Sequence, residues 1–162
     1  MEEGVKYTSR DAENRICELR HAGIECQVSG NEDKTKLDAY QYSPLSLAYI
    51  GDSVLDLMVK SYFVMHVNKQ TYKYHKDVSN IVKAVNQASF IDDILDELSE
   101  DECEIYKRGR NATTHSKAKN ATMGEYRKAT GLEALYGYMY LKGDIDRLQM
   151  FVGRMIEKYL NA

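Results

Sequence analysis

The stretch LAYIGDSVLDL, residues 47–57, decides the fold class of this chain and raises the question of its function. Its apolar residues have the spacing of a helix interior, yet Gly51 and Asp52 stand side by side at its centre. Glycine costs roughly 1 kcal/mol against alanine inside a helix, and burial of an unpaired carboxylate is expensive. Either the helix is kinked around a solvated aspartate, or the carboxylate is held in a cleft for chemistry.

The pattern around this stretch predicts a long central helix. Ser43 is a good N-cap, and Pro44 suits the first helical position, where its missing N–H costs nothing. Apolar residues then recur at helical spacing on more than one face, which is typical of a central helix rather than a surface one. A short helix is predicted after a capping box at Ser99. Three longer helical patterns cover residues 68–98, 125–143 and 145–160.

Composition supports an all-α bundle and excludes several classes of protein. The chain of 162 residues has one proline and no segment with the pattern of a strand. Its three cysteines lack CxxC spacing, which favours a reducing, cytoplasmic setting without a zinc site. No apolar run approaches the roughly 18 residues of a membrane span, and no apolar signal core precedes the first helix. We expect residues 1–36 to be an appendage and residues 37–162 to form one domain.

Two of the predicted helices combine an acidic residue with small residues. Asp52 follows Gly51 in one, and Glu133 precedes Ala134 and Gly137 in the other. Small residues let helix backbones approach closely, so the two acids could face one another across a narrow cleft. Facing carboxylates repel unless a cation neutralises them, and oxygen ligands suit Mg²⁺. The alternative is that each acid is solvated or paired with a lysine or arginine.

The formal net charge of −3 hides a strong asymmetry along the chain. Residues 92–104 hold eight acidic residues and no basic one, whereas residues 107–128 hold seven Lys or Arg and one Glu. Residues 108–124 have few large apolar side chains and are predicted to be a long loop. Such a loop is either solvated and balanced by the acidic segment, or it binds phosphates. The candidates for contacts to phosphates are Arg108, Arg110, Asn111, His115, Lys117 and Lys119.

Three motifs resemble those of one known family. LAYIGDSVLDL resembles the signature helix of the ribonuclease III domain, in which a Gly-Asp pair follows an apolar stretch. LEALYGYMYL, residues 132–141, resembles the second acidic motif of that domain. YKRGRNA, residues 106–112, is similar to the short bacterial branch, Mini-ribonuclease III, which has the catalytic domain without a double-stranded-RNA-binding domain.

The resemblance implies an all-helical ribonuclease III-type bundle that forms a homodimer and cleaves double-stranded RNA. It also implies Mg²⁺ as cofactor, for which Mn²⁺ can substitute, with Asp52 and Glu133 as catalytic metal ligands. The short branch is associated with maturing the ends of the large-subunit (23S) ribosomal RNA precursor in the cytoplasm. The basic loop would then stand in for the absent RNA-binding domain.

Two positions depart from the pattern of the longer family members. These carry a Glu four residues before the signature Asp and an Asp three residues before the second Glu. Here the two positions hold Ala48 and Thr130. Thr130 and Asp56, which lies one turn beyond Asp52, are candidates for supporting the ligands, although a solvated Asp56 is the simpler reading. The missing carboxylates motivate an alternative, a non-catalytic RNA- or ribosome-binding protein on the same fold.

Overall fold

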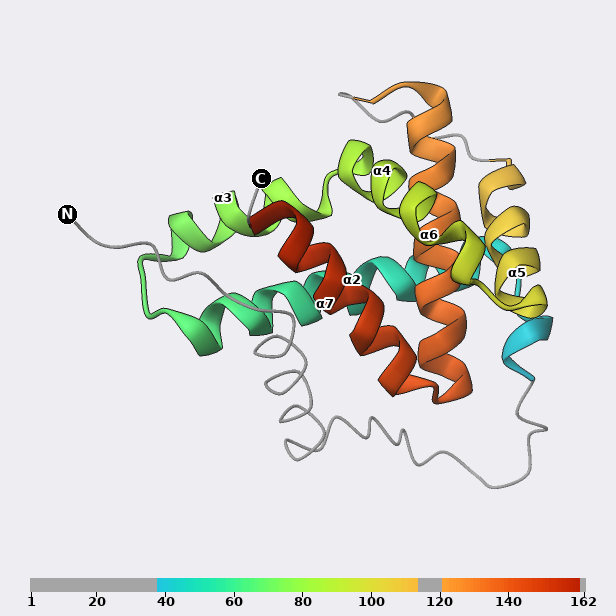
Figure 1. Cartoon of the computed structure of the whole chain (residues 1–162), viewed down its shortest axis with the longest axis horizontal. Helices are drawn as coiled ribbons and strands as arrows, with labels where there is room; N and C mark the ends of the chain where they lie inside the picture. Colours follow the sequence, from blue (N-terminus) through green and yellow to red (C-terminus); the bar gives the residue numbers. More distant parts are fainter. Residues whose placement is uncertain (1–37, 114–120, 161–162) are drawn as a thin grey trace.

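The computed structural model describes residues 38–113 and 121–160. Within these two ranges all regular structure is helical and no strand occurs, which confirms the predicted all-α class (Figure 1). The expected appendage of residues 1–36 lies outside the described ranges. The helices, in chain order, are η1 (Ala39–Gln41), α2 (Pro44–His66), α3 (Thr71–Val82), α4 (Ala84–Ile94), η2 (Leu95–Glu97), α5 (Glu100–Asn111), α6 (Met123–Lys142) and α7 (Ile145–Leu160).

Local capping explains where the principal helices begin and end. The Ser43 side chain accepts a hydrogen bond from the Ser46 N–H at the start of α2. Capping boxes that begin at Ser99 and Thr122 open α5 and α6. Gly143 ends α6 with a φ of 85°, a left-handed conformation that favours glycine. These signals are local in sequence, so the bounds of α2 and the C-terminus of α6 agree with the predictions.

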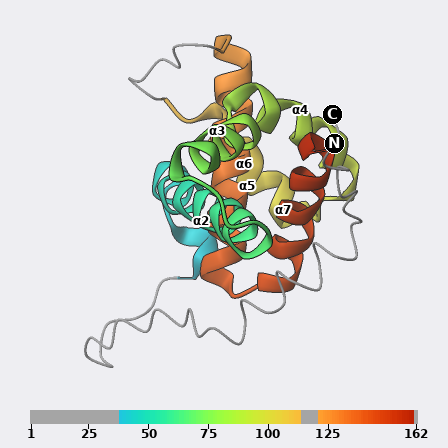
Figure 2. The same cartoon turned by 90° about the vertical axis from the view of Figure 1, so that its left-hand side faces the viewer.

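Helix α6 is the centre of the bundle (Figure 1). Helix α2 crosses it, α5 and α4 pack along it, and α7 follows it after the turn at Gly143. Helices α2 and α7 also contact one another, and in Figure 2 α2 lies to the left and α7 to the right. The main hydrophobic core lies between these helices and includes Leu55, Ile91, Leu135 and Phe151, all fully buried.

The closest helix packing joins α2 to α6 at Gly51 and Gly137. A Cβ added at Gly51 would lie 1.8 Å from the Glu133 carbonyl oxygen, and one at Gly137 would lie 2.0 Å from the Leu47 carbonyl oxygen. Each helix therefore presses its backbone into the other at a point where no side chain fits. Glycine is required here by close approach, and its low helix propensity is the cost of that contact.

Two predictions about the helices were wrong. The pattern over residues 68–98 is not one helix, because Lys83 is extended, with φ −61° and ψ 144°, and separates α3 from α4. The long loop was predicted to begin at Arg108, but α5 continues through Asn111. The local sequence permits either a helix or an extended backbone at both places. Packing against α2 and α6 therefore selects the break at Lys83 and the helix through Asn111.

The α2–α6 crossing predicts a large penalty for Gly51→Ala. Its methyl group would overlap backbone atoms that cannot rotate away, so we expect the free energy of unfolding to fall by about 3 kcal/mol or more. Gly124→Ala in the first turn of α6 is the matched control, because the nearest atom to its added Cβ is the Thr122 hydroxyl at 3.9 Å. That variant should be neutral or stabilised by up to about 1 kcal/mol. Urea unfolding of both proteins measures the difference, and equal stabilities would contradict the close crossing.

Candidate active site

The α2–α6 crossing brings Asp52 and Glu133 together. Gly51 packs against the backbone of Glu133 itself, so the neighbouring Asp52 on α2 lies beside the Glu133 side chain on α6. Asp52 is exposed, whereas Glu133 is partly buried. The two acids predicted from separate motifs therefore form a pair with one solvated member and one sheltered member.

The environment of this acid pair favours protonation or a cation. Burial, and next the negative charge of Asp52, raise the pKa of Glu133 to about 7, while a hydrogen bond from Gln87 opposes the shift. The pKa of Asp52 is also raised, by burial and by the charge of Asp56. The hydrogen bond from Gln87 therefore leaves the negative charge of the Asp52–Glu133 pair incompletely neutralised. A divalent cation bound by oxygen ligands would relieve this repulsion, so the donor set fits Mg²⁺ or Mn²⁺.

Gln87 is a residue of this site that the sequence analysis missed. Its side-chain amide, on α4, donates to Glu133 Oε1 at 3.1 Å and to the Val82 carbonyl oxygen at 2.9 Å. A signal was present, because Gln87 stands at helical spacing from the buried residues Phe90, Ile91 and Ile94. A polar residue in such a register requires a partner. The sequence alone does not say that the partner is on α6.

The positions of the missing family carboxylates are filled by packing. Ala48 is buried in a small apolar cluster with Ala39 of η1 and Ala134 of α6. Thr130 is also buried, and its hydroxyl donates to the Tyr126 carbonyl oxygen at 3.0 Å within α6. Neither position offers a carboxylate, and among residues 38–113 and 121–160 no cluster of three or more His, Cys, Asp or Glu side chains could hold a metal ion. Asp52 and Glu133 are therefore the carboxylates available at the crossing itself.

Asp56 has a partner of its own. Its carboxylate pairs with Lys60, one turn further along α2, at 2.5 Å. Both side chains are well exposed, so this pair contributes little to stability. Asp56 acts on the acid pair through its charge, which raises the pKa of Asp52. A role in supporting the metal ligands stays a prediction.

Arg108 makes structural contacts that its sequence context did not indicate. Its guanidinium donates to the Tyr40 and Tyr42 carbonyl oxygens at 2.8 and 2.9 Å and lies over the Tyr40 ring. These contacts hold η1 and the start of α2 against α5. The predicted binding of RNA by Arg108 stays a prediction, and it would have to compete with these two hydrogen bonds.

Arg110 and Asn111 lie in the last turn of α5, beside the loop. The Arg110 guanidinium lies over the Tyr106 ring and donates to the Asn111 side chain at 3.3 Å. Arg110 has no acidic partner within the described parts of the chain. The other three RNA-binding candidates, His115, Lys117 and Lys119, lie outside the described residues.

Among the described residues, four acids of the segment 92–104 pair with basic side chains of α6 and α7. Arg154 binds Glu97 through two hydrogen bonds, and Arg147 binds the buried Glu102. Lys158 pairs with Asp93 at 2.5 Å, and Lys128 of α6 pairs with Asp92. Whether the other acids of this segment balance the loop charges stays open, because residues 114–120 lie outside the described residues.

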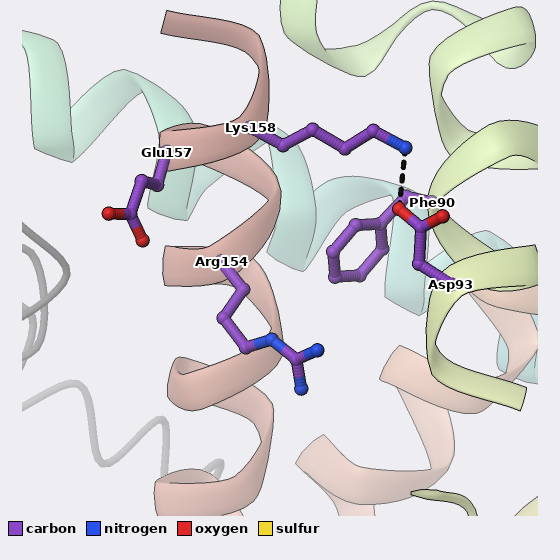
Figure 3. A pocket seen from close by; sticks show the side chains of 5 residues that line it. All are labelled: Phe90, Asp93, Arg154, Glu157 and Lys158. Carbon is purple, nitrogen blue, oxygen red and sulfur yellow. Dashed lines mark hydrogen bonds and ion pairs between the residues drawn. The ribbon is translucent and has the colours of Figure 1, made fainter. Parts of the chain in front are cut away.

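One open hollow of about 260 Å³ lies elsewhere, between α4 and α7 (Figure 3). Its lining consists of Phe90, Asp93, Arg154, Glu157 and Lys158. The Lys158 side chain reaches across to Asp93, so the charges at its mouth are engaged with one another. The hollow includes neither acid of the pair and contributes nothing to that site.

No described helix is long and apolar enough to span a membrane.

Comparisons with known proteins place this geometry in a family. The ribonuclease III domain matches residues 45–144, a range that includes both acids and the α2–α6 crossing. The chain therefore belongs to the ribonuclease III family and is an endoribonuclease. Within the family it falls in the Mini-ribonuclease 3 group.

The relatives support that placement. The chain is 42% identical over 130 residues to Mini-ribonuclease 3 of Clostridium tetani, covering 79% of this chain and 85% of that protein. It is 37% identical to Mini-ribonuclease 3 of Staphylococcus aureus, over 70% of this chain and 87% of the relative. A crystal structure of a protein from Fusobacterium nucleatum matches with a TM-score of 0.68 at 29% identity, covering 76% of this chain and 98% of that one.

The raised pKa of Glu133 predicts an unusual pH dependence in the metal-free protein. Between the ordinary value of 4.5 and the value of about 7, the folded state keeps a proton that the unfolded chain has released. The contribution of Glu133 to the free energy of unfolding therefore falls as pH rises from 5 to 8, by on the order of 1–3 kcal/mol. Urea unfolding in a chelator at both pH values, with Glu133→Gln beside the wild type, isolates this term. Parallel pH profiles for the two proteins would contradict it.

Proposed function

We propose that this endoribonuclease hydrolyses double-stranded RNA with a divalent cation, Mg²⁺ or Mn²⁺, held by Asp52 and Glu133. The observation that carries the proposal is the acid pair at the α2–α6 crossing, in which burial and Asp52 raise the pKa of Glu133. When bound, such a cation activates water and stabilises charge on the scissile phosphate. The two carboxylates supply the negative charge that attracts the cation. The close packing of α2 against α6 keeps them next to one another.

Recognition of the duplex is proposed to rest on shape and phosphates. A-form RNA presents a shallow minor groove, so a protein contacts mainly its backbone and 2′-hydroxyls. Arg110 and Asn111, at the end of α5, stand where the basic segment begins. Lys117 and Lys119 of the same segment would extend this contact, as the resemblance to the short branch implies.

We also propose that the active form is a homodimer. Leu45, Tyr49 and Leu57 lie at helical spacing on one face of α2 and are exposed, Tyr49 by 79%. Large apolar side chains on one helix face indicate a protein interface, and a second copy is the partner that the family implies. Sedimentation equilibrium should give twice the chain mass of 18.6 kDa. A monomer in the presence of Mg²⁺ and RNA would overturn this part of the proposal.

The proposed substrate is the precursor of the large-subunit (23S) ribosomal RNA, in the cytoplasm. Support comes from the resemblance to the short branch of the family. Mapping of cut sites on pre-ribosomal RNA, with wild type beside Asp52→Asn, tests it. Cuts at the ends of the mature RNA support the proposal, and cuts scattered over unrelated duplexes alone contradict it.

Asp52→Asn and Glu133→Gln should each lower the cleavage rate by at least about a hundredfold, because loss of a ligand forfeits several kcal/mol of charge stabilisation. The measurement is single-turnover cleavage of a duplex RNA at saturating Mg²⁺. Asp96→Asn on η2, an exposed acid outside the pair, is the matched control and should cleave normally. Unfolding curves check that each variant folds. Wild-type rates in either acid variant would remove the acid pair from the mechanism.

Arg110→Ala should weaken duplex binding and reduce the slope of log K against log salt by about 1, because one phosphate contact is lost. Arg108→Ala is the comparison variant, because it removes the hydrogen bonds to the Tyr40 and Tyr42 carbonyl oxygens. It should lower the free energy of unfolding by about 1–3 kcal/mol. Binding titrations at several salt concentrations and urea unfolding separate the two effects. An unchanged slope in Arg110→Ala would show that Arg110 does not contact phosphate.

A further inference from the structure

Gln87 is a polar side chain buried in the helix bundle, and its presence there needs a physical reason. It is only 2% exposed and stands on α4 among Ala88, Phe90 and Ile91. A primary amide in such surroundings is destabilising unless hydrogen bonds satisfy it. Its position follows from the break at Lys83, which ends α3 and turns α4 so that Gln87 faces α6.

The hydrogen bonds fix the orientation of the Gln87 amide. The Val82 carbonyl at the end of α3 can only accept, and it lies 2.9 Å from Nε2. The second amide hydrogen is donated to Glu133 Oε1, 3.1 Å away. A flipped amide would turn its own carbonyl oxygen toward two acceptors. Both donors of this side chain are therefore committed, one to the backbone of α3 and one to the acid pair.

The remaining atom of the amide, Oε1, shows that stability is not the full explanation. It is buried and accepts no hydrogen bond from any described residue. A buried acceptor without a donor is costly, so an apolar side chain of the same size would relieve one penalty while losing two hydrogen bonds. An apolar side chain can supply neither donor, and of the two only the donor to Glu133 reaches the acid pair. Gln87 is also the one donor that the described part of the chain offers to this carboxylate.

We propose that Gln87 is a positioning residue: by holding Glu133 Oε1 it keeps the carboxylate at the α2–α6 crossing and makes the pair with Asp52 competent to bind a divalent cation. The inference rests on the proposed function of the acid pair as the cation site. Glutamate has three rotatable side-chain bonds, and Gln87 holds one carboxylate oxygen while leaving Oε2 for a ligand. Groups that orient metal ligands in this way typically change metal affinity or activity by 10–100-fold when removed.

The competing explanation is that Gln87 only caps the end of α3. The chain offers a matched control, because the side-chain amide of the neighbouring Asn86 donates to the Asn80 carbonyl oxygen of α3 at 2.5 Å. Asn86 thus performs a similar capping role and makes no hydrogen bond to Glu133. Asn86→Ala removes a cap alone, whereas Gln87→Met removes both the cap and the donor to Glu133 with little change in side-chain length.

The test is Mn²⁺ binding to the RNA-free protein, followed by electron paramagnetic resonance, together with the Mg²⁺ dependence of cleavage. We expect Gln87→Met to raise the Mn²⁺ dissociation constant and the half-saturating Mg²⁺ concentration about tenfold or more. Asn86→Ala should stay within about twofold of wild type in both. If Gln87→Met does not fold, Gln87→Asn, which is too short to reach both partners, replaces it. Wild-type Mn²⁺ binding by the Gln87 variant, or equal losses in both variants, would overturn the proposal.

The same titration separates this inference from the proposed function. Asp52→Asn and Glu133→Gln should abolish Mn²⁺ binding if the acid pair is the cation site. If they bind Mn²⁺ normally, the proposed site itself fails. If they lose binding while Gln87→Met keeps it, the site stands and only the positioning role of Gln87 is refuted.

Discussion

The backbone contact between α2 and α6 is the constraint on which the rest of the structure depends. Gly51 and Gly137 each occupy a place where a methyl group would overlap the carbonyl of the opposite helix. Helices that touch in this way cannot slide or rotate without a clash. The crossing therefore sets the positions of the residues beside these glycines, and Asp52 and Glu133 are among them. A packing requirement and a chemical requirement are met by the same few residues.

The contact also places two negatively charged side chains close together, and their repulsion favours the binding of a cation. Packing at the crossing removes water from Glu133, and the charge of Asp52 is close enough to raise its pKa further. Gln87 offsets part of that cost with a single hydrogen bond. The remainder is relieved by a proton in the metal-free protein or, under the proposed function, by a divalent cation bound to the pair. Only the second state leaves both carboxylates ionised and able to serve as ligands at neutral pH.

Sequence reasoning succeeded where the signal is local and failed where it depends on distant partners. The Gly51–Asp52 pair and the small residues around Glu133 correctly indicated a close approach of two helices. The end of α3 at Lys83 was missed because nothing in the local pattern forbids a continuous helix there. Arg108 was placed in a basic loop because its partners, the carbonyls near η1, lie 66 and 68 residues away in the chain. Charge and spacing describe a side chain, but they do not identify what it will contact.

The sequence by itself determined that the chain is helical, where α2 begins and where α6 ends, because caps and apolar periodicity act within a few residues. It also named Asp52 and Glu133 as the candidate acids. The tertiary structure decided that the two acids lie close together, that Gln87 donates to Glu133 and that Arg108 donates to backbone carbonyl groups. It also paired Asp93, Glu97 and Glu102 with basic side chains of α7. These outcomes depend on which helix faces come into contact, and that choice is made by the packing of the whole bundle.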